Sequence, residues 1–362
     1  NSNMLGYSCA RVCPVEVLCA GACVYNHWDD RKPIEIGRLQ RYAVVEALRS
    51  DPQLLAKVRK PATGKKIALV GAGPASLAAA GHLALEGHKA VIFERNHVPG
   101  GLNTLGIAPY KLKAEDSLSE IEFILGLGDV EIHTGISVVS GEAGEHEVSV
   151  EHLVDDADAV FIGIGLGTDS SLDIEGIDGP GVEGATALIA RIKTDETLSL
   201  DDCSTAIVVG GGNTAIDIAH ELALLGVRDV CMAYRRTEDK MSGYRHEMAG
   251  ARLDGVRLVP NAQPTKVVRS SDGSVTGLEL ECTTSGGKEV VACDLVVLAI
   301  GQARLTELAK SFDGVELDEK GRILVDEDTC RTGNSKVYAG GDCVNGGKEV
   351  VNAAEHGKRA AR

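Results

Sequence analysis

Short apolar runs alternate with glycine turns and Ala/Leu-rich segments along most of the chain, a pattern typical of parallel strands connected by helices. The clearest example covers residues 65–94. An apolar run at 67–70 leads into the turn GAGPAS (71–76), then into an Ala/Leu-rich helix and a second apolar run that ends at Glu94. This order predicts a βαβ unit with a glycine turn at its first strand–helix junction.

A turn of this kind is typical of dinucleotide binding. Its glycines allow a tight turn and a close approach of pyrophosphate, to which the helix N-terminus offers free N–H groups. The acid that ends the second strand suits the hydroxyls of an adenosine ribose. The alternative is an ordinary βαβ turn without a ligand. The predicted cofactor-binding residues of this unit are Gly71, Gly73, Pro74, Ala75, Ser76 and Glu94.

The same pattern recurs from Thr205 onward, with one change of charge. A strand at 206–209 is followed by GGGNTA (210–215), a helix and a strand at 229–234, after which two arginines stand in place of an acid. Paired cations there favour a 2′-phosphate, so the first unit suits FAD and the second suits NADPH. The alternative for the arginines is a solvated charge pair. The predicted NADPH-binding residues are Gly210, Gly212, Asn213, Thr214, Arg235 and Arg236.

Further segments are expected to connect or extend the two units. They are a helix at 38–49, a linker at 51–64 with a short helix between Pro52 and Pro61, a return strand at 157–167, a helix at 185–192 and a β-meander at 254–293. The run LVVLAIGQ (295–302), with Gly301 as a further cofactor-binding residue, is expected to return to the first nucleotide domain. The segment VYAGGD (337–342) predicts a strand and a Gly-Gly-Asp turn before a final helix.

Composition limits the class of protein. The chain has 362 residues, enough for two or three domains, and its hydrophobic fraction of 44% is ordinary for a globular protein. A net charge of −16 argues against binding to nucleic acid or anionic membranes, and no apolar stretch is long enough to span a bilayer. The chain starts at Asn1 rather than Met and stops at Arg362 within a predicted helix, so we expect part of a longer protein.

Four of the ten cysteines lie close together near the start of the chain, at Cys9, Cys13, Cys19 and Cys23. No C-x-x-C pair occurs, which excludes the usual redox dithiol of disulfide reductases. Four interpretations compete: an iron–sulfur site, a zinc site, a disulfide pair and buried free thiols. The spacing and the proline after Cys13 favour iron–sulfur over zinc. The other cysteines are scattered, so we expect a reducing, cytoplasmic compartment.

Several other catalytic signatures are missing from the sequence. It contains no H-x3-H or H-E-x2-H arrangement, no G-x-S-x-G elbow and no P-loop Lys-Ser/Thr pair. A zinc hydrolase, a serine hydrolase and a P-loop enzyme are therefore unsupported. No catalytic acid or base is predicted, because hydride transfer to a flavin needs positioning and electrostatics rather than a proton-transfer residue.

The N-terminal cysteine segment resembles a known family. CARVCPVEVLCAGACVYN (9–26), followed by KPIEIGRLQRYA (32–43), is similar to the N-terminal iron–sulfur domain of dihydropyrimidine dehydrogenases and the related glutamate synthase small subunits. The resemblance implies two [4Fe-4S] clusters, with further cysteine ligands upstream of this segment. It implies that Cys13, Cys19 and Gln40 ligate one cluster, that Cys23 ligates the other, and that Cys9 is only a neighbour.

The same resemblance extends the predicted FAD site. It implies that residues 95–112 run along FAD, where consecutive glycines let the backbone approach a ligand; a plain turn is the alternative. It also implies that a helix starting near Glu349 points its N-terminus at the isoalloxazine ring. The FAD-binding residues that it adds are Gly101, Leu102, Lys111, Gly341 and Asp342.

We therefore expect an α/β protein with two interleaved Rossmann-like domains preceded by a mostly helical iron–sulfur domain. The iron–sulfur domain is placed at 1–60, the FAD-binding domain at 65–166 and 295–362, and the NADPH-binding domain at 167–294.

The resemblance implies a flavoprotein oxidoreductase subunit that passes electrons from NADPH to FAD and on through [4Fe-4S] clusters to a partner. This partner is expected to be an FMN-containing catalytic subunit or domain that reduces uracil or thymine. Ser76 in GAGPAS, the five residues between Cys13 and Cys19, and Gln40 favour this pyrimidine branch. The alternatives are a glutamate synthase small subunit, a ferredoxin:NADP transhydrogenase subunit and a non-catalytic flavoprotein that senses redox state.

Overall fold

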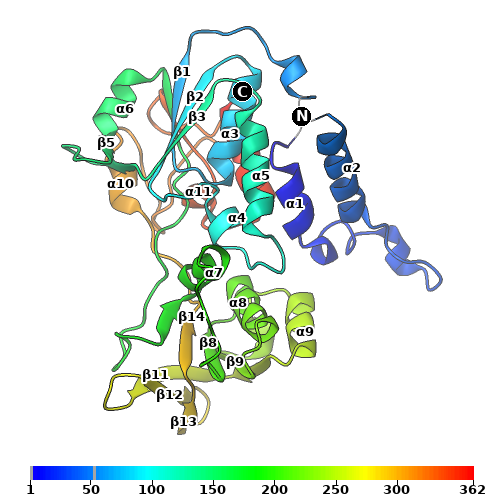
Figure 1. Cartoon of the computed structure of the whole chain (residues 1–362), viewed down its shortest axis with the longest axis vertical. Helices are drawn as coiled ribbons and strands as arrows, with labels where there is room; N and C mark the ends of the chain where they lie inside the picture. The colour runs from blue at the N-terminus through cyan, green and yellow to red at the C-terminus, as the bar shows by residue number, and fades with distance from the viewer. Residues whose placement is uncertain (1–2, 52–53) are drawn as a thin grey trace. The chain divides into compact units, whose positions relative to one another are not determined.

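The computed structural model of the chain describes residues 3–51 and 54–362 (Figure 1). Contacts divide them into two compact units. The first unit contains 3–51, 54–104, 114–166 and 304–362, and the second contains 105–113 and 167–303. The chain therefore passes between the units repeatedly, which agrees with the predicted interleaving and adds the short excursion at 105–113.

A five-stranded parallel sheet with the order β15-β6-β1-β2-β3 forms the centre of the first unit. Its strands are β1 (Lys66–Val70), β2 (Lys89–Glu94), β3 (Val130–Thr134), β6 (Ala159–Ile162) and β15 (Val337–Ala339). Successive side chains of β1 point to opposite faces, because Leu69 joins one hydrophobic cluster and Ala68 and Val70 join another. Both faces are therefore covered, as is usual for a parallel sheet.

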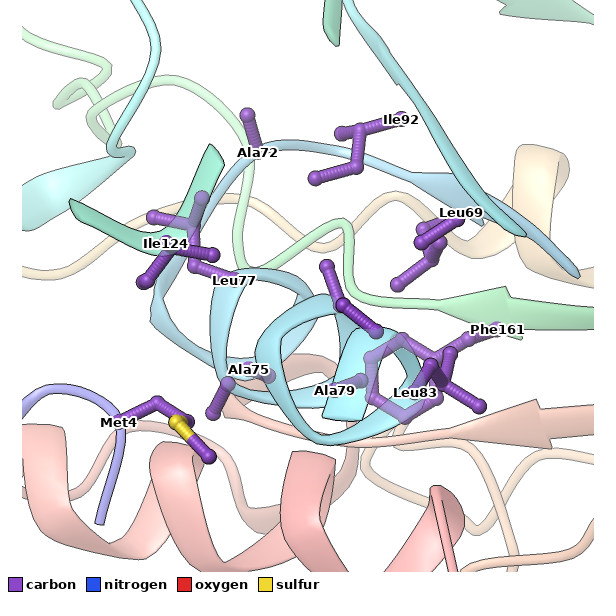
Figure 2. Close-up of a cluster of buried hydrophobic side chains, with 14 of the residues drawn as sticks. Met4, Leu69, Ala72, Ala75, Leu77, Ala79, Leu83, Ile92, Ile124 and Phe161 are labelled. Atoms are coloured by element: carbon purple, nitrogen blue, oxygen red, sulfur yellow. The ribbon is translucent and has the colours of Figure 1, made fainter. Parts of the chain in front are cut away.

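Helix α3 (Pro74–Leu85) lies at the centre of the first of these clusters. Figure 2 shows Leu69 and Ile92 of the sheet on one side of α3 and Met4 on the other. The remaining helices of the unit are α4 (Leu102–Leu105), α5 (Ala114–Leu125), α6 (Val150–Asp156), α10 (Thr306–Lys310), α11 (Asp342–Asn345) and α12 (Val350–Ala360). A small parallel pair, β4 (Ser137–Val139) and β5 (Glu147–Ser149), completes it.

The N-terminal segment is mostly helical, as predicted. Its helices are α1 (Gly6–Val12), α2 (Ile36–Ser50) and three short 3-10 helices (Val15–Val17, Val24–His27 and Ala56–Val58). The last of these falls within the helix expected between Pro52 and Pro61, of which Pro52 lies outside the described residues. The segment belongs to the first unit, because Met4 and Leu5 are buried in its hydrophobic cluster.

A second five-stranded parallel sheet, with the order β10-β9-β8-β14-β7, forms the centre of the second unit. Its strands are β7 (Val182–Gly184), β8 (Thr205–Val209), β9 (Asp229–Tyr234), β10 (Arg257–Pro260) and β14 (Leu295–Leu298). Its helices are α7 (Ala185–Thr194), α8 (Asn213–Leu224), α9 (Arg245–Leu253) and the 3-10 helix Glu238–Lys240. An antiparallel sheet of β11 (Ala262–Arg269), β12 (Val275–Cys282) and β13 (Lys288–Ala292) completes the unit.

Two expectations about this region differ from the structure. The predicted meander is formed by β11–β13 alone, because β10 pairs in parallel with β9 as an edge of the larger sheet. The run at 295–302 was expected in the first nucleotide domain, but β14 pairs with β8 and β7 in the second sheet. Its four residues are all buried, as a central strand requires, and the chain enters the first unit only after residue 303.

Candidate functional site

The first glycine turn joins β1 to α3 with little room for side chains. Gly71 has a φ of +87°, and a Cβ on it would lie 2.8 Å from the carbonyl oxygen of Gly163. Helix α3 starts directly with Pro74, and its N-cap Gly73 provides no side-chain hydrogen bond to the first turn. The helix N-terminus is thus left for another hydrogen-bond acceptor, as a dinucleotide site requires.

Glu94 ends β2 next to this turn and is only 5% exposed. Its two carboxylate oxygens accept hydrogen bonds from the backbone N–H groups of Ala72 (2.7 Å) and Asn96 (2.8 Å). The carboxylate therefore fixes the glycine turn to the end of the neighbouring strand. Sequence reasoning assigned Glu94 to a ribose and missed this structural role; the assignment to the ribose stays a prediction.

The consecutive glycines after β2 approach the same turn. The Gly100 N–H donates to the carbonyl of Ala72 (2.9 Å), and a Cβ on Gly101 would lie 2.9 Å from the Cα of Gly73. Leu102 then begins the short helix α4. The structure thus brings Gly101 and Leu102 beside the first glycine turn, where the sequence expected the chain to follow FAD.

The Gly-Gly-Asp turn reaches the N-terminus of α3 from the other end of the chain. Gly341 has a φ of +80°, and a Cβ on it would lie 3.1 Å from the Cβ of Ala75. The Gly341 N–H donates to Nδ1 of His356 on α12 (3.0 Å), and burial lowers the pKa of His356, which favours this neutral acceptor. Asp342 follows, and burial raises the pKa of its carboxyl group. Sequence reasoning missed His356, which lies 15 residues from its partner.

The residues around α3 fit a bound dinucleotide. Ser76 is fully buried, and its hydroxyl has no hydrogen-bond partner within the described part of the chain. The nearest atom to a Cβ on Gly73 would be 3.8 Å away, and a Cβ on Gly165 would meet open space. An orphaned hydroxyl and open space beside a helix N-terminus are what a phosphate-containing cofactor requires.

The second glycine turn joins β8 to α8 in the second unit. A Cβ on Gly210 would lie 2.3 Å from the carbonyl oxygen of Ala299, so this position needs glycine. Gly212 is the N-cap of α8 and gives no side-chain hydrogen bond, while the Asn213 side chain accepts from the Tyr244 N–H (2.9 Å). Thr214 is exposed on the first turn of the helix. This helix N-terminus is again available to an anion.

Arg235 and Arg236 directly follow β9 and are exposed. Backbone carbonyls hold the pair in place: Arg236 accepts from the Asn261 N–H, and Arg235 accepts from the Thr283 hydroxyl. Within residues 3–51 and 54–362, neither guanidinium forms an ion pair. Both charges are therefore available to a ligand, whereas Glu94 at the matching place in the first unit is buried.

Lys111 lies in the second unit, on the excursion at 105–113. Its ammonium group pairs with the carboxylates of Asp217 on α8 (2.6 Å) and Glu247 on α9 (2.5 Å). Burial alone would lower the pKa of Lys111, but these two carboxylates outweigh it and raise the pKa. The neighbouring Tyr110 hydroxyl also donates to Asp217 (2.8 Å). This partly buried cluster fixes the excursion to the second unit; a contact of Lys111 with FAD stays a prediction.

Gly301 follows β14 with a φ of +107°, and a Cβ on it would meet open space. Its carbonyl accepts from the Ser170 N–H (2.9 Å). Gly301 therefore lies in the second unit, and its role at a cofactor is a prediction.

All ten cysteines are free thiols, which removes the disulfide interpretation. Cys13 is partly buried, and the nearby Cys19 contributes to raising its pKa after the larger effect of burial. The Cys23 sulfur accepts from the Ile34 N–H (3.4 Å). Closely spaced thiols suit the soft-ligand chemistry of iron–sulfur clusters. Nevertheless, no group of three or more His, Cys, Asp or Glu residues in the described part of the chain is arranged to hold a metal ion.

Comparisons with known proteins place these features in a family. Residues 65–357 match the pyridine nucleotide-disulphide oxidoreductase family, and residues 1–51 match dihydropyrimidine dehydrogenase domain II, 4Fe-4S cluster. The glutamate synthase [NADPH] small chain of Escherichia coli K12 is 34% identical over 99% of this chain and 80% of that protein. The NAD-dependent dihydropyrimidine dehydrogenase subunit PreT of E. coli O157:H7 is 31% identical over 99% of this chain and 81% of that protein.

Solved structures show the same fold. Thioredoxin reductase of T. acidophilum covers 82% of this chain and 97% of its own, with a TM-score of 0.67 and 22% identity. Mycobacterium tuberculosis FprA in complex with NADPH covers 83% of each chain, with a TM-score of 0.61 and 18% identity.

The two glycine turns and these matches define a two-nucleotide flavoprotein oxidoreductase. The chain belongs to the pyridine nucleotide-disulphide oxidoreductase family. It is an NAD(P)H-dependent FAD oxidoreductase of the electron-transfer type with an N-terminal 4Fe-4S domain, so the predicted fold class, family and cofactors are confirmed. In the described residues, no helix has the length and apolar character needed to cross a membrane.

Proposed function

We propose that this protein takes reducing equivalents from NADPH onto FAD and delivers them through its N-terminal iron–sulfur domain to a partner catalytic subunit. The observation that supports this most strongly is the contrast between the two nucleotide units. The strand after the first turn ends in the buried carboxylate of Glu94, and the strand after the second is followed by the exposed cations Arg235 and Arg236. The acidic end suits the ribose hydroxyls of FAD, and the cationic end suits the 2′-phosphate of NADPH.

The chain's own residues bind and orient the cofactors. The turn at Gly71 and the N-terminus of α3 hold the FAD pyrophosphate, while Gly341 and Asp342 position the ribityl end. The turn at Gly210 holds the NADPH pyrophosphate, and the two arginines hold its 2′-phosphate. When bound, FAD accepts a hydride from NADPH and releases electrons one at a time.

In this proposal, the N-terminal segment carries the electrons from the flavin to the partner subunit. By family resemblance, Cys13, Cys19 and Gln40 serve one [4Fe-4S] cluster and Cys23 serves the other. The described residues do not contain a complete ligand set, so further ligands from elsewhere in the full-length protein are part of this proposal.

For the partner, we propose an FMN-containing subunit that reduces a pyrimidine. The match of residues 1–51 to dihydropyrimidine dehydrogenase domain II and the relative PreT support this assignment. The second candidate is glutamate synthesis, and the exposed pair Arg235 and Arg236 favours it. The name of the glutamate synthase small chain specifies NADPH, whereas the name of PreT specifies NAD. A pair of arginines without ion-pair partners among the described residues is expected of an enzyme that uses NADPH.

The assignment of NADPH to the second unit is tested by the double variant Arg235→Gln/Arg236→Gln. One charge-assisted hydrogen bond contributes about 1.5–3 kcal/mol, so the loss of even one such contact is expected to raise KM for NADPH at least roughly 10- to 100-fold, with KM for NADH almost unchanged. Steady-state kinetics with each nucleotide and an artificial electron acceptor measure both constants. Equal changes for the two nucleotides would refute the assignment.

The partner is identified by reconstitution. The protein is combined with the catalytic subunit encoded beside it, and NADPH oxidation is followed with uracil, or with glutamine plus 2-oxoglutarate. Turnover with uracil supports pyrimidine reduction, and turnover with glutamine plus 2-oxoglutarate contradicts it in favour of glutamate synthesis.

A further inference from the structure

Helix α1 contains Cys9 and ends at Cys13, yet it has only seven residues. A helix of this length is not stable by itself in water, so tertiary contacts decide whether it forms. Its N-cap residue, Leu5, provides no side-chain hydrogen bond to the first turn. The cap comes instead from helix α5 of the same unit.

The carboxylate of Glu120 on α5 performs this capping. It accepts hydrogen bonds from the backbone N–H groups of Tyr7 (2.7 Å) and Ser8 (3.2 Å) and from the Ser8 hydroxyl. Glu120 is 4% exposed and Ser8 is completely buried. A residue 112 positions away in the sequence thus replaces a local N-cap.

Asp116 lies one turn earlier on α5 and holds the rest of α1. One of its oxygens accepts from the Tyr7 hydroxyl (2.7 Å), and the other pairs with the guanidinium of Arg11 in the last turn (2.9 Å). About one-fifth of each side chain of this ion pair is exposed, so it is better shielded from solvent than an ordinary surface pair. The two acids therefore hold both ends of α1.

The start of α1 is also anchored by apolar contacts. Met4 and Leu5 are buried in the cluster around α3, and Figure 2 shows Met4 beside this helix. Cys9 packs against the same cluster, and burial raises its pKa to about 12. The packing of Cys9 against apolar side chains is consistent with its predicted role as a neighbour of the clusters.

Cys13 follows the last residue of α1, and α1 and α12 are in contact. Glu349 is the N-cap of α12, which packs on α3 and holds the Gly-Gly-Asp turn through His356. The first proposed cluster ligand and the proposed flavin site are thus connected through α1 and α12.

We propose that Glu120 and Asp116 are positioning residues that hold the cysteine-bearing helix α1 on the flavin-binding unit and so set the distance for electron exit. The inference rests on the proposed function, because it assigns a cluster ligand to Cys13. Electron transfer slows steeply as donor and acceptor move apart. A loosened α1 therefore slows the delivery of electrons from the flavin while the uptake of hydride from NADPH continues.

The test compares Glu120→Gln and Tyr7→Phe in the full-length holoprotein, with Glu122→Gln as the matched control on an exposed position of the same helix. The first variant replaces one of the two accepting oxygens by an NH2 group, which cannot accept a hydrogen bond, and the second removes only the hydroxyl that donates to Asp116. Hydrogen exchange of the α1 amides, measured by mass spectrometry in the same holoprotein, is expected to speed up at least tenfold in Glu120→Gln and less in Tyr7→Phe. The control is expected to match the wild type.

Rapid kinetics then separate the two halves of the reaction. Reduction of FAD by NADPH is expected to stay within twofold of wild type in both variants, while onward electron delivery falls at least tenfold in Glu120→Gln. Unchanged α1 exchange in both variants would overturn the docking role. Faster exchange with unchanged onward delivery would overturn the positioning role. If the wild type does not reduce FAD with NADPH, the proposed function fails, whereas the exchange result still decides the docking of α1.

Discussion

At the scale of single residues, two equivalent strands end at or just before side chains of opposite charge, and the proposed assignment of nucleotides rests on this difference. Glu94 is buried, and two backbone N–H groups fix the orientation of its carboxylate. Arg235 and Arg236 are exposed on a turn whose carbonyls accept hydrogen bonds from the second unit. One site is thus rigid and acidic, and the other is open and cationic.

Replacing Glu94 by Ala is expected to weaken both the fold and FAD binding. The N–H groups of Ala72 and Asn96 lose their acceptors, and an unsatisfied buried group costs about 1–3 kcal/mol. We expect a loss of that size in the free energy of unfolding of the apoprotein, measured by urea titration, together with weaker FAD binding in a fluorescence titration. Asp129→Asn, at an exposed position before β3, is the control. Wild-type stability and FAD affinity in Glu94→Ala would contradict the role assigned to Glu94.

The sequence was sufficient to find these charged ends because each follows a recognisable strand–turn–helix pattern. It was not sufficient to find Glu120 or His356, since their partners lie 112 and 15 positions away and nothing local marks them. An isolated glutamate within an amphipathic helix looks like a solvated charge. Its burial and its role depend on a helix that reaches it only after folding.

At the scale of elements, the close packing of α12 on α3 holds the flavin-binding segments together. A Cβ on Gly357 would lie 2.1 Å from the carbonyl oxygen of Ala75 and 2.7 Å from the nitrogen of Ala79. These are backbone atoms, so no side-chain rotation can make room. The N-terminus of α3 therefore depends on a glycine near the end of the chain.

Gly357→Ala is expected to destabilise the first unit and to reduce FAD retention. Overpacking costs about 1–3 kcal/mol, which exceeds the gain of about 1 kcal/mol from replacing a helical glycine by alanine. Gly250→Ala in α9 is the control, because the nearest atom to its Cβ would be 4.0 Å away, and it should stabilise the protein slightly. Thermal unfolding and flavin content after gel filtration measure the two effects. Equal responses of the two variants would argue against close α3–α12 packing.

The docking of α1 on α5 is expected to depend on pH through Glu120. Burial raises the pKa of Glu120 to about 7, so the folded state binds the proton more tightly than the unfolded state. Its contribution to stability is therefore fully present at low pH and is lost as the pH rises through about 7, with a slope approaching about 1.4 kcal/mol per pH unit. Other ionisable groups at this contact are Tyr7, Cys9, Arg11 and Asp116.

Urea unfolding of the apoprotein, followed by the fluorescence of Trp28, the single tryptophan, measures this dependence in the N-terminal segment. The difference in unfolding free energy between wild type and Glu120→Gln is expected to shrink from about pH 5 to about pH 8. Parallel curves for the two proteins would contradict a raised pKa at this site.

The order of elements within each βαβ unit could be predicted from the sequence, and the structure confirms it at β1–α3–β2 and β8–α8–β9. The sheet to which β14 belongs could not be predicted. Its residues are apolar on both faces, which fits a central strand of either sheet. The parallel pairing of β10 with β9 was missed for a similar reason. The sequence of a four-residue strand does not indicate whether it pairs in parallel or antiparallel.

At the scale of the whole molecule, the chain is divided between two units that exchange segments. The excursion at 105–113 leaves the first unit and then returns to it. In the second unit it is fixed by the partly buried cluster of Lys111, Asp217 and Glu247. The sequence predicted the interleaving but not this excursion, because the acids that hold it lie more than a hundred residues away. Each unit keeps its own parallel sheet and its own glycine turn.

The central claim is that one unit holds FAD, the other binds NADPH, and electrons pass from the second cofactor to the first. The most direct measurement is anaerobic mixing of the FAD-loaded protein with NADPH, followed by an artificial electron acceptor. The account predicts that NADPH bleaches the flavin absorbance, that the acceptor restores it, and that cycles repeat while NADPH lasts. A protein that retains FAD but shows no bleaching and no turnover with NADPH would contradict the account and favour a non-catalytic flavoprotein.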